Sequence, residues 1–196
     1  MSEEMLVCHC SPTLAGLKTG SLFSCPYSSQ KMIIKEIREF NQKLTQKGIR
    51  IIPVRISDKR MLVYVYRPEK LKEDFSDEKT QIILKCKGYD CTNLSQCICR
   101  LIQKLQSDPD FPHEIGLFLG YPAEDVKGFI ENKAACSKCS GCWKVYGDEQ
   151  AARILFKKYK KCTEIYCRRW KSGVAVEQLT ITICLLYTSP SPRDLS

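Results

Sequence analysis

Long hydrophobic runs are missing from this sequence of 196 residues. No apolar stretch approaches the length that a helix needs to cross a membrane, which excludes a membrane-spanning helix. The opening residues, MSEEMLVCHC, start acidic and lack the basic flank and apolar segment of a signal peptide. We therefore expect a cytoplasmic protein without a membrane partner. Internal repeats and low-complexity segments are also lacking, as in an ordinary globular chain.

Glycine-rich phosphate-binding motifs are absent as well. The chain has neither a G-x-G-x-x-G motif nor a Walker lysine. The nearest stretch, GLFLGYP at residues 116–122, has glycines around an expected strand-to-helix turn. Glu124 and Asp125 follow in the first turn of the expected helix, where they match the helix dipole but would repel a phosphate. Phosphate binding through this loop is therefore not expected.

Cysteines, by contrast, are numerous. The chain has 13 of them, an odd number, and most are isolated in the sequence. In a reducing compartment such cysteines remain thiols rather than a disulfide framework. Hydrophobic residues make up 43% of the chain and charged residues 27%, which is typical of a globular protein with a real core. The net charge of +9 permits an anionic partner without identifying one.

The last thirteen residues differ from the rest. The string CLLYTSPSPRDLS, residues 184–196, resembles a translated transposon-adaptor sequence of the kind left at the ends of metagenomic reads. We interpret it as an artefactual, disordered tail and exclude it from the fold. The alternative is a genuine disordered tail rich in proline and serine. Residues 1–183 are then expected to form a single globular domain, and its net charge remains +9 because the tail holds one Arg and one Asp.

Several segments have the spacing of amphipathic helices. In residues 28–48 apolar side chains recur every three or four positions, either of two serines can cap the start, and Gly48 can end the helix. Asp148 can cap a long helix over residues 149–170. Similar patterns predict helices over residues 77–87, 93–106 and 121–132.

Other segments are typical of strands. Residues 49–56 and 60–66 are rich in β-branched and aromatic side chains and are predicted to form a hairpin. Pro53 cannot donate to a strand ladder, so the first of these strands should be bulged or at an edge. Further strands are expected at residues 4–10, 114–120 and 142–147.

A helix start is expected at Ser11–Pro12, directly after the first of these strands. Residues 174–183 fit either a strand or a short helix. Together the elements predict a mixed α/β (α+β) fold, a single domain with a mixed sheet that contains a β-hairpin and is flanked by helices.

The first candidate site is a thiol site. Cys10 comes just before the expected helix start, where free N–H groups would lower the pKa of the thiol. His113, at the mouth of an expected strand, could be its base, and Glu114 a third, orienting group. This layout is similar to that of papain-like thiol enzymes, by analogy of fold alone. The leading hypothesis is a cysteine-dependent hydrolase or acyl transferase; the alternatives are a core Cys10, a His113 that caps the strand end, and His9 as base.

The second candidate is a metal site. Cys136, Cys139 and Cys142 follow the C-x2-C-x2-C spacing of ferredoxin-type iron–sulfur ligands, which usually need a remote fourth cysteine. Zinc more often uses two separated pairs. Only one triplet is present and its last member begins an expected strand, so a cluster or zinc ion is not the preferred reading. A fourth ligand could come from Cys25, Cys162 or Cys167.

The third candidate is a basic helix. Cations dominate residues 153–171, with aromatic side chains between them, as on surfaces that bind nucleic acid or another anionic ligand. The alternative is a solvated helix face whose aromatic residues belong to the core. Tyr159 and Tyr166 support this alternative, because both lie on the face of the expected helix that should point toward the core. The cations proposed to bind are Lys157, Lys158, Lys161, Arg168 and Arg169.

Four phrases carry a family resemblance. They are HCSPTLAGLKTGSLF, FPHEIGLFLGYPAEDVKGFIEN, GCWKVYGD and ARILFKKYKKCTEIY, in this order. Together they resemble an uncharacterised bacterial family, domain of unknown function 3793, over residues 5–182. The resemblance implies no established activity. It directs attention to Lys18 in the first phrase and to Cys142 and Trp143 in the third, which we add to the candidate binding residues.

Overall fold

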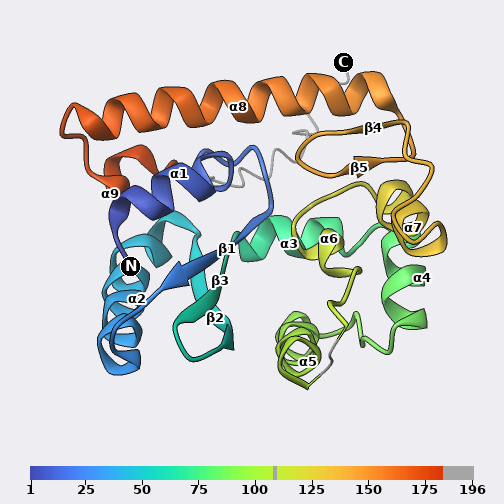
Figure 1. Cartoon of the computed structure of the whole chain (residues 1–196), viewed down its shortest axis with the longest axis horizontal. Helices are drawn as coiled ribbons and strands as arrows, with labels where there is room; N and C mark the ends of the chain where they lie inside the picture. Colours follow the sequence, from blue (N-terminus) through green and yellow to red (C-terminus); the bar gives the residue numbers. More distant parts are fainter. Residues whose placement is uncertain (108–109, 183–196) are drawn as a thin grey trace, which may run out of the picture.

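A three-stranded sheet forms the centre of the computed structural model, which describes residues 1–107 and 110–182 (Figure 1). Its strands are β1 (Gly20–Pro26), β2 (Arg50–Ile56) and β3 (Arg60–Tyr66), in the order β1-β3-β2 with both pairings antiparallel. Successive side chains of a strand point to opposite faces. Val63 and Val65 therefore pack into one core cluster, while Tyr64 and Tyr66 pack into another.

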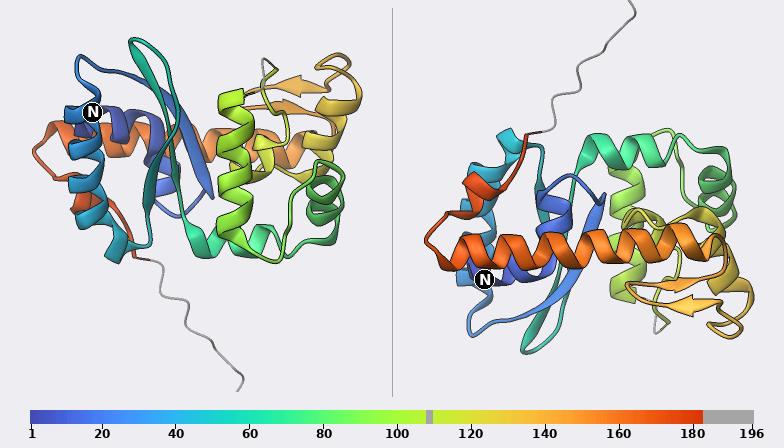
Figure 2. Two further views of the ribbon diagram at one scale, coloured as in Figure 1. Left: turned by 90° about the horizontal axis from the view of Figure 1, so that it is seen from below. Right: turned by 90° about the horizontal axis from the view of Figure 1, so that it is seen from above.

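Helices cover both faces of the sheet (Figure 2). One face packs on α1 (Glu3–Leu14), α2 (Gln30–Leu44) and α9 (Val176–Leu179), with the 3-10 turn η1 (Thr45–Lys47) after α2. The other face is covered by helices that follow β3 in the chain. These are α3 (Pro68–Asp74), α4 (Glu78–Cys86), α5 (Leu94–Ser107), α6 (Ile115–Phe118) and α7 (Ala123–Glu131).

The long helix α8 (Glu149–Lys171) runs along one whole side of the molecule (Figure 1). Its C-terminal half packs on α1. Near its start it packs on a small hairpin of β4 (Cys139–Ser140) and β5 (Lys144–Val145), where Trp143 and Val145 share a core cluster with Tyr159. No helix within the described ranges is long and apolar enough to cross a bilayer.

The expected fold class, single domain, hairpin and flanking helices are confirmed, and the three-stranded sheet proves to be antiparallel. Ser29 caps α2, and Gly48 ends η1 with φ 76°, a backbone that favours glycine. The register of the edge strand β2 shifts between Pro53 and Arg55, as the missing proline donor predicts. Asp148 caps α8 through the N–H of Ala151.

Two of the expected strands are wrong. Residues 4–10 lie in α1, which Ser2 caps, so Ser11–Pro12 lies in the last turn of a helix instead of at its start. Residues 114–120 contain the short helix α6, whose four residues are all buried. In a fully buried segment such as α6, no polar face shows whether the apolar residues repeat with the period of a helix or of a strand. The sequence pattern therefore does not distinguish the two.

The ambiguous C-terminal segment contains the helix α9, and the expected strand at 142–147 is reduced to the two residues of β5. The tail at 184–196 lies outside the described residues.

Candidate functional site

An apolar cavity of about 340 Å³ lies between β1, α6, α7 and the β4–β5 hairpin. Its polar lining comes from His113, Asp125, Ser140, Cys142 and Lys144. Apolar and aromatic side chains form most of the wall, as in many sites for small molecules. Among them are Leu22, Leu119, Tyr121, Val126, Phe129 and Trp143.

Trp143 is the centre of an aromatic cluster at this cavity. The Trp143 ring stacks on Tyr121 with centroids 4.6 Å apart, and Phe156 meets it edge-on at 4.6 Å. Such offset and edge-to-face pairs stabilise the arrangement beyond the area that they bury. One side of Trp143 therefore belongs to the core under α8, while another is part of the cavity wall.

Asp125 fixes the position of Trp143. One carboxylate oxygen accepts a hydrogen bond from Trp143 Nε1 at 2.6 Å, and the other accepts from the backbone N–H groups of Tyr146 and Gly147, both at 2.7 Å. The side chain is buried at 3% exposure. The sequence had marked Asp125 only as an acid in the first turn of a helix. Its role depends on contacts between the phrase FPHEIGLFLGYPAEDVKGFIEN, which contains Asp125, and the phrase GCWKVYGD. The residue spacing within either phrase does not indicate these contacts.

Cys142 lies in the turn of the β4–β5 hairpin and is exposed. It lines the cavity and also a second depression, a groove of about 520 Å³ between α1 and α8. We call this depression the α1–α8 groove; its walls include His9, Lys18, Lys160 and Glu164. Cys142 is thus the side chain at which the apolar cavity and the more polar groove meet.

Lys18 is the charged neighbour of Cys142. Its Nζ lies 5.0 Å from the centroid of the Tyr121 ring, in a cation–π contact. Burial lowers the pKa of Lys18, and the negative charge of a Cys142 thiolate would raise it again. Burial raises the pKa of Cys142, and Lys18 lowers it. Each group therefore stabilises the charged form of the other.

Cys10 lies in different surroundings from those expected. It is in the interior of α1, fully buried, instead of at a helix N-terminus. Burial raises the pKa of its thiol to about 12, although Lys18 and Ser21 oppose this shift. The thiol is then protonated at neutral pH and packed among apolar side chains. The premise on which Cys10 had been chosen as nucleophile is wrong.

The structure separates the other two members of that expected triad from Cys10. His113 is exposed, packs edge-on against Phe129 with ring centroids 4.9 Å apart, and lines the cavity. Glu114 is buried and accepts hydrogen bonds from Lys104 at 2.7 Å and Tyr89 at 3.1 Å. Burial would raise the pKa of Glu114, but the hydrogen bonds, that from Lys104 first, lower it. Within the described ranges, no hydrogen bond joins Cys10 to His113 or His113 to Glu114.

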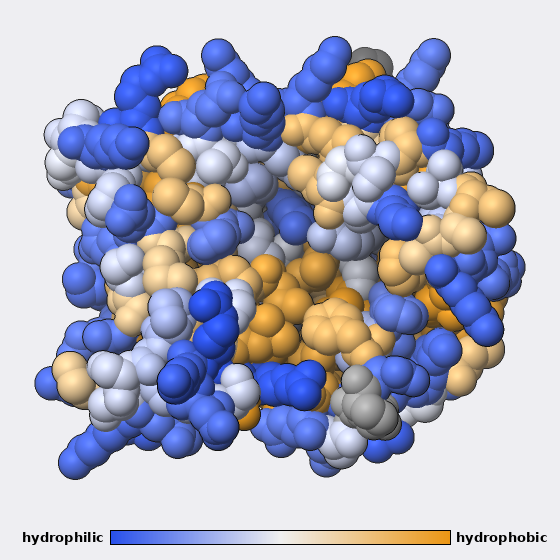
Figure 3. Space-filling model, viewed as in Figure 1, coloured by the Kyte–Doolittle hydropathy of each residue, from blue (hydrophilic) through white to orange (hydrophobic). Residues whose placement is uncertain are grey.

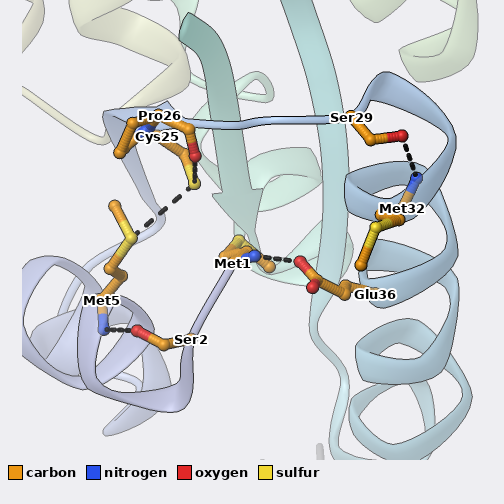
Figure 4. A network of polar contacts seen from close by, with 8 residues as sticks. All are labelled: Met1, Ser2, Met5, Cys25, Pro26, Ser29, Met32 and Glu36. Carbon is orange, nitrogen blue, oxygen red and sulfur yellow. Dashed lines mark hydrogen bonds and ion pairs between the residues drawn. The ribbon is translucent and has the colours of Figure 1, made fainter.

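The three cysteines of the C-x2-C-x2-C run do not converge. Cys136 lies in a loop with φ 57°, Cys139 in β4 and Cys142 in the following turn. Across residues 1–107 and 110–182, no group of three Cys, His, Asp or Glu side chains could hold a metal ion. Cys25, the remote ligand considered first, is buried in β1, with its sulfur 3.7 Å from the sulfur of Met5 (Figure 4).

The basic residues of α8 point outward. The cations at 157, 158, 160, 161, 168, 169 and 171 are all exposed, and the edge along α8 is mostly hydrophilic in Figure 3. Of the aromatic residues between them, Tyr159 is buried and Tyr166 is partly buried against the core of α1 and α2. The rings on this helix therefore serve packing, and the exposed face offers charge.

The cavity, the groove and the hairpin define a single-domain mixed α/β protein with a thiol at the junction of two depressions. The chain belongs to the family described as "Protein of unknown function (DUF3793)", whose model matches residues 6–180. No curated protein and no solved structure matches it.

Proposed function

We propose that the chain is a cysteine-dependent enzyme of the hydrolase or acyl transferase type, with Cys142 in place of Cys10 as the nucleophile. The observation that carries this proposal is the position of Cys142. It is an exposed thiol that lines an apolar cavity and shares the wall of the α1–α8 groove with the amine of Lys18. A nucleophilic thiol needs access to substrate, a proton acceptor and a binding surface for the acyl group. The surroundings of Cys142 offer all three, whereas Cys10 is buried.

Lys18 is the proton acceptor that the electrostatics favour. Burial lowers the pKa of the amine and raises that of the thiol, so the two values move toward each other. The thiol–amine pair and the thiolate–ammonium pair therefore come closer in free energy, so the proton can move from Cys142 to Lys18 and back during the reaction. The Cys142 thiolate adds to the acyl carbon, the leaving group departs with a proton, and water or another acceptor takes the acyl group. His113, on the wall of the same cavity, is a second candidate base for that last step.

Hydrolysis of p-nitrophenyl butyrate tests the nucleophile. The Cys142→Ser variant should lose about 100-fold or more in kcat/KM, because a serine hydroxyl is not activated by the same amine. The matched control is Cys136→Ser, another exposed thiol three residues before β4, which should retain the full rate. Equal rates in the two variants would refute Cys142 as the nucleophile.

The pH dependence of alkylation tests Lys18. Iodoacetamide reacts with the thiolate, and Lys18 lowers the pKa of Cys142. The Lys18→Met variant keeps an apolar stem but removes the charge, so the pKa of Cys142 should rise. Alkylation of Cys142 should then be slower at neutral pH and should equal the wild-type rate at high pH. Rates for each cysteine are read by peptide mass spectrometry, with Cys136 as the internal reference. An unchanged profile would exclude Lys18 as its partner.

A second function has support from the outer face of α8. This helix of 23 residues is about 35 Å long, and none of its seven exposed cations after Phe156 forms an ion pair with a carboxylate in the part of the chain that the structure describes. We propose this face as a surface for an anionic partner, with nucleic acid as the candidate to test.

Binding of a labelled single-stranded DNA 20-mer measures this second function. Affinity should fall steeply as salt rises, because phosphate contacts release counterions. A triple charge reversal on α8 should weaken binding by about 10-fold or more, while the same change on α3 and at the C-terminal end of α4 should have little effect. Salt-independent binding, or equal losses in the two triple variants, would contradict the proposal. The variants reverse Lys157, Lys158 and Lys161 on α8, and Lys72, Lys85 and Lys87 as the control.

A further inference from the structure

We infer that the substrate is a thioester that joins a short apolar or aromatic acyl group to an anionic leaving thiol. This inference rests on the proposed function of Cys142. Its basis is that Cys142 lines both the apolar cavity and the α1–α8 groove. A carbonyl carbon held at Cys142 then has one substituent directed into each depression.

The cavity suits the acyl group. At about 340 Å³ it lies at the low end of the range for small-molecule sites, so it has room for a short or aromatic acyl group. The rings of Tyr121 and Trp143 line it, and Leu119 and Val126 complete an apolar wall. Asp125 offers little to a polar acyl group, because three of its about four acceptor sites are already used within the protein.

The groove suits an anion. Lys18 and Lys160 line it with His9, and Glu164 is the carboxylate on its wall. Neither lysine forms an ion pair with a carboxylate in the described ranges. A partly buried ammonium without a counter-ion has lost hydration that no protein charge replaces, so an anionic ligand would stabilise it. The leaving thiol is the part of the substrate that would supply this anion.

The reaction balances without a further reagent. The Cys142 thiolate adds to the thioester carbon, the bond from that carbon to the leaving sulfur breaks, and the departing thiolate takes the proton that Lys18 received. Water then adds to the acyl–Cys142 thioester, releasing the carboxylic acid and restoring the thiol. The net reaction converts one thioester and one water into one acid and one thiol.

Two thioesters that differ only in charge test the inference. Phenylacetyl thioesters of 3-mercaptopropionate and 3-mercaptopropionamide have the same acyl group and nearly the same shape. After correction for their uncatalysed rates, kcat/KM should be about 5-fold higher for the carboxylate. The preference should disappear in the exposed Lys160→Gln variant and at high salt. Lys59→Gln, exposed in the β2–β3 turn and outside the groove, should retain it.

The outcomes separate the inference from the proposed function. Equal turnover of both thioesters, lost in Cys142→Ser, would overturn the anionic leaving group and leave Cys142 as the nucleophile. Turnover of neither thioester, with an alkylation profile of Cys142 that does not change in Lys18→Met, would overturn both. Thermal unfolding of Lys160→Gln checks that this surface change leaves the fold intact.

A second and independent observation concerns Cys8 and Cys167. Their sulfur atoms lie 3.7 Å apart, one on α1 and the other on α8. Cys8 is exposed and Cys167 is partly exposed on the wall of the α1–α8 groove, so small oxidants can reach the pair. A disulfide bond needs a sulfur separation of about 2.05 Å, so the two side chains must rotate to bring their sulfur atoms together.

We propose that this pair is a redox modification site that responds to peroxide. Hydrogen peroxide oxidises the exposed Cys8 thiol to a sulfenic acid and releases one water. The Cys167 thiol then attacks that sulfur, forming the disulfide and releasing a second water. The product links α1 to α8 beside the groove, and a thiol reductant reverses it.

Peptide mapping after mild peroxide treatment tests the pair. Trypsin should yield a linked peptide of residues 1–18 and 162–168, lighter by two hydrogen atoms than the separate peptides and lost after reduction. Each of these peptides has a second cysteine, which supplies the controls. The link should persist in Cys162→Ser and be absent in Cys8→Ser and Cys167→Ser. A link that survives in Cys8→Ser, or oxidation of both thiols without a link, would overturn the proposal.

Discussion

Replacing Arg67 with methionine is expected to lower the free energy of unfolding by about 3–5 kcal/mol. Arg67 is 3% exposed, and its guanidinium donates to four backbone carbonyls. Methionine fills a similar volume but donates nothing, so these carbonyls lose their charged partner in a buried place. The partners are the carbonyls of Thr13, Leu14, Lys47 and Ile181.

The size of this effect follows from where those carbonyls lie. Thr13 and Leu14 are in the last turn of α1, where carbonyls need partners from outside the helix. The N–H groups of Gly16 and Ile181 supply one each, and Arg67 supplies the charged one. A cation there also matches the negative end of the helix dipole. Lys47 ends η1, and Ile181 follows α9, so one side chain holds three chain segments at the start of α3. Lysine cannot replace its planar set of donors, so Arg67→Lys should lose nearly as much.

Urea unfolding followed by tryptophan fluorescence measures the loss. Arg50→Met is the matched control, because Arg50 is exposed and donates to a single side chain, Thr45. Its free energy of unfolding should change by about 0.5 kcal/mol or less. Arg67 would have no special structural role if the two variants unfolded at the same urea concentration.

Much of this fold could be predicted from local patterns. The helices α2, α5 and α8 each bury one stripe and expose the other, so the period of 3.6 residues is visible in the sequence. The β2–β3 hairpin has strand-forming residues on both sides of a short turn. In α6 all four residues are buried, and the burial pattern that distinguishes helix from strand is lost.

The wrong prediction of a strand at residues 4–10 led to the choice of Cys10 as the candidate nucleophile. Because residues 4–10 were expected to form a strand, the helix start was placed at Ser11, and Cys10 gained the surroundings of a reactive thiol. The helix starts at Glu3, so the same cysteine lies within the helix and is fully buried. Cys142 and Trp143 could be singled out as residues of one short phrase. Their link to Lys18 and Asp125 could not, since it exists only after α1, α7 and the β4–β5 hairpin pack together.

The second large effect is expected at Asp125. The Asp125→Asn variant should lose about 2–4 kcal/mol of unfolding free energy, although asparagine has almost the same shape. One oxygen of Asp125 accepts from the indole of Trp143 and the other from two backbone N–H groups. An amide has a single oxygen, so in either orientation its NH2 group faces a donor. A donor at a position of 3% exposure is then left without its acceptor.

The neighbouring acid gives the matched control. Glu124 is exposed and pairs with Lys79 at the surface, so Glu124→Gln should change the free energy of unfolding by about 1 kcal/mol or less. The two variants remove the same charge from adjacent positions of α7, which cancels any effect on the helix dipole. Asp125→Asn should also free Trp143 from its place in the cavity wall, so its fluorescence should shift in the folded protein and alkylation of Cys142 should change rate. Equal unfolding midpoints for the two variants would mean that Trp143 is held by its ring contacts alone, because the hydrogen bond to Asp125 would then contribute no net stability.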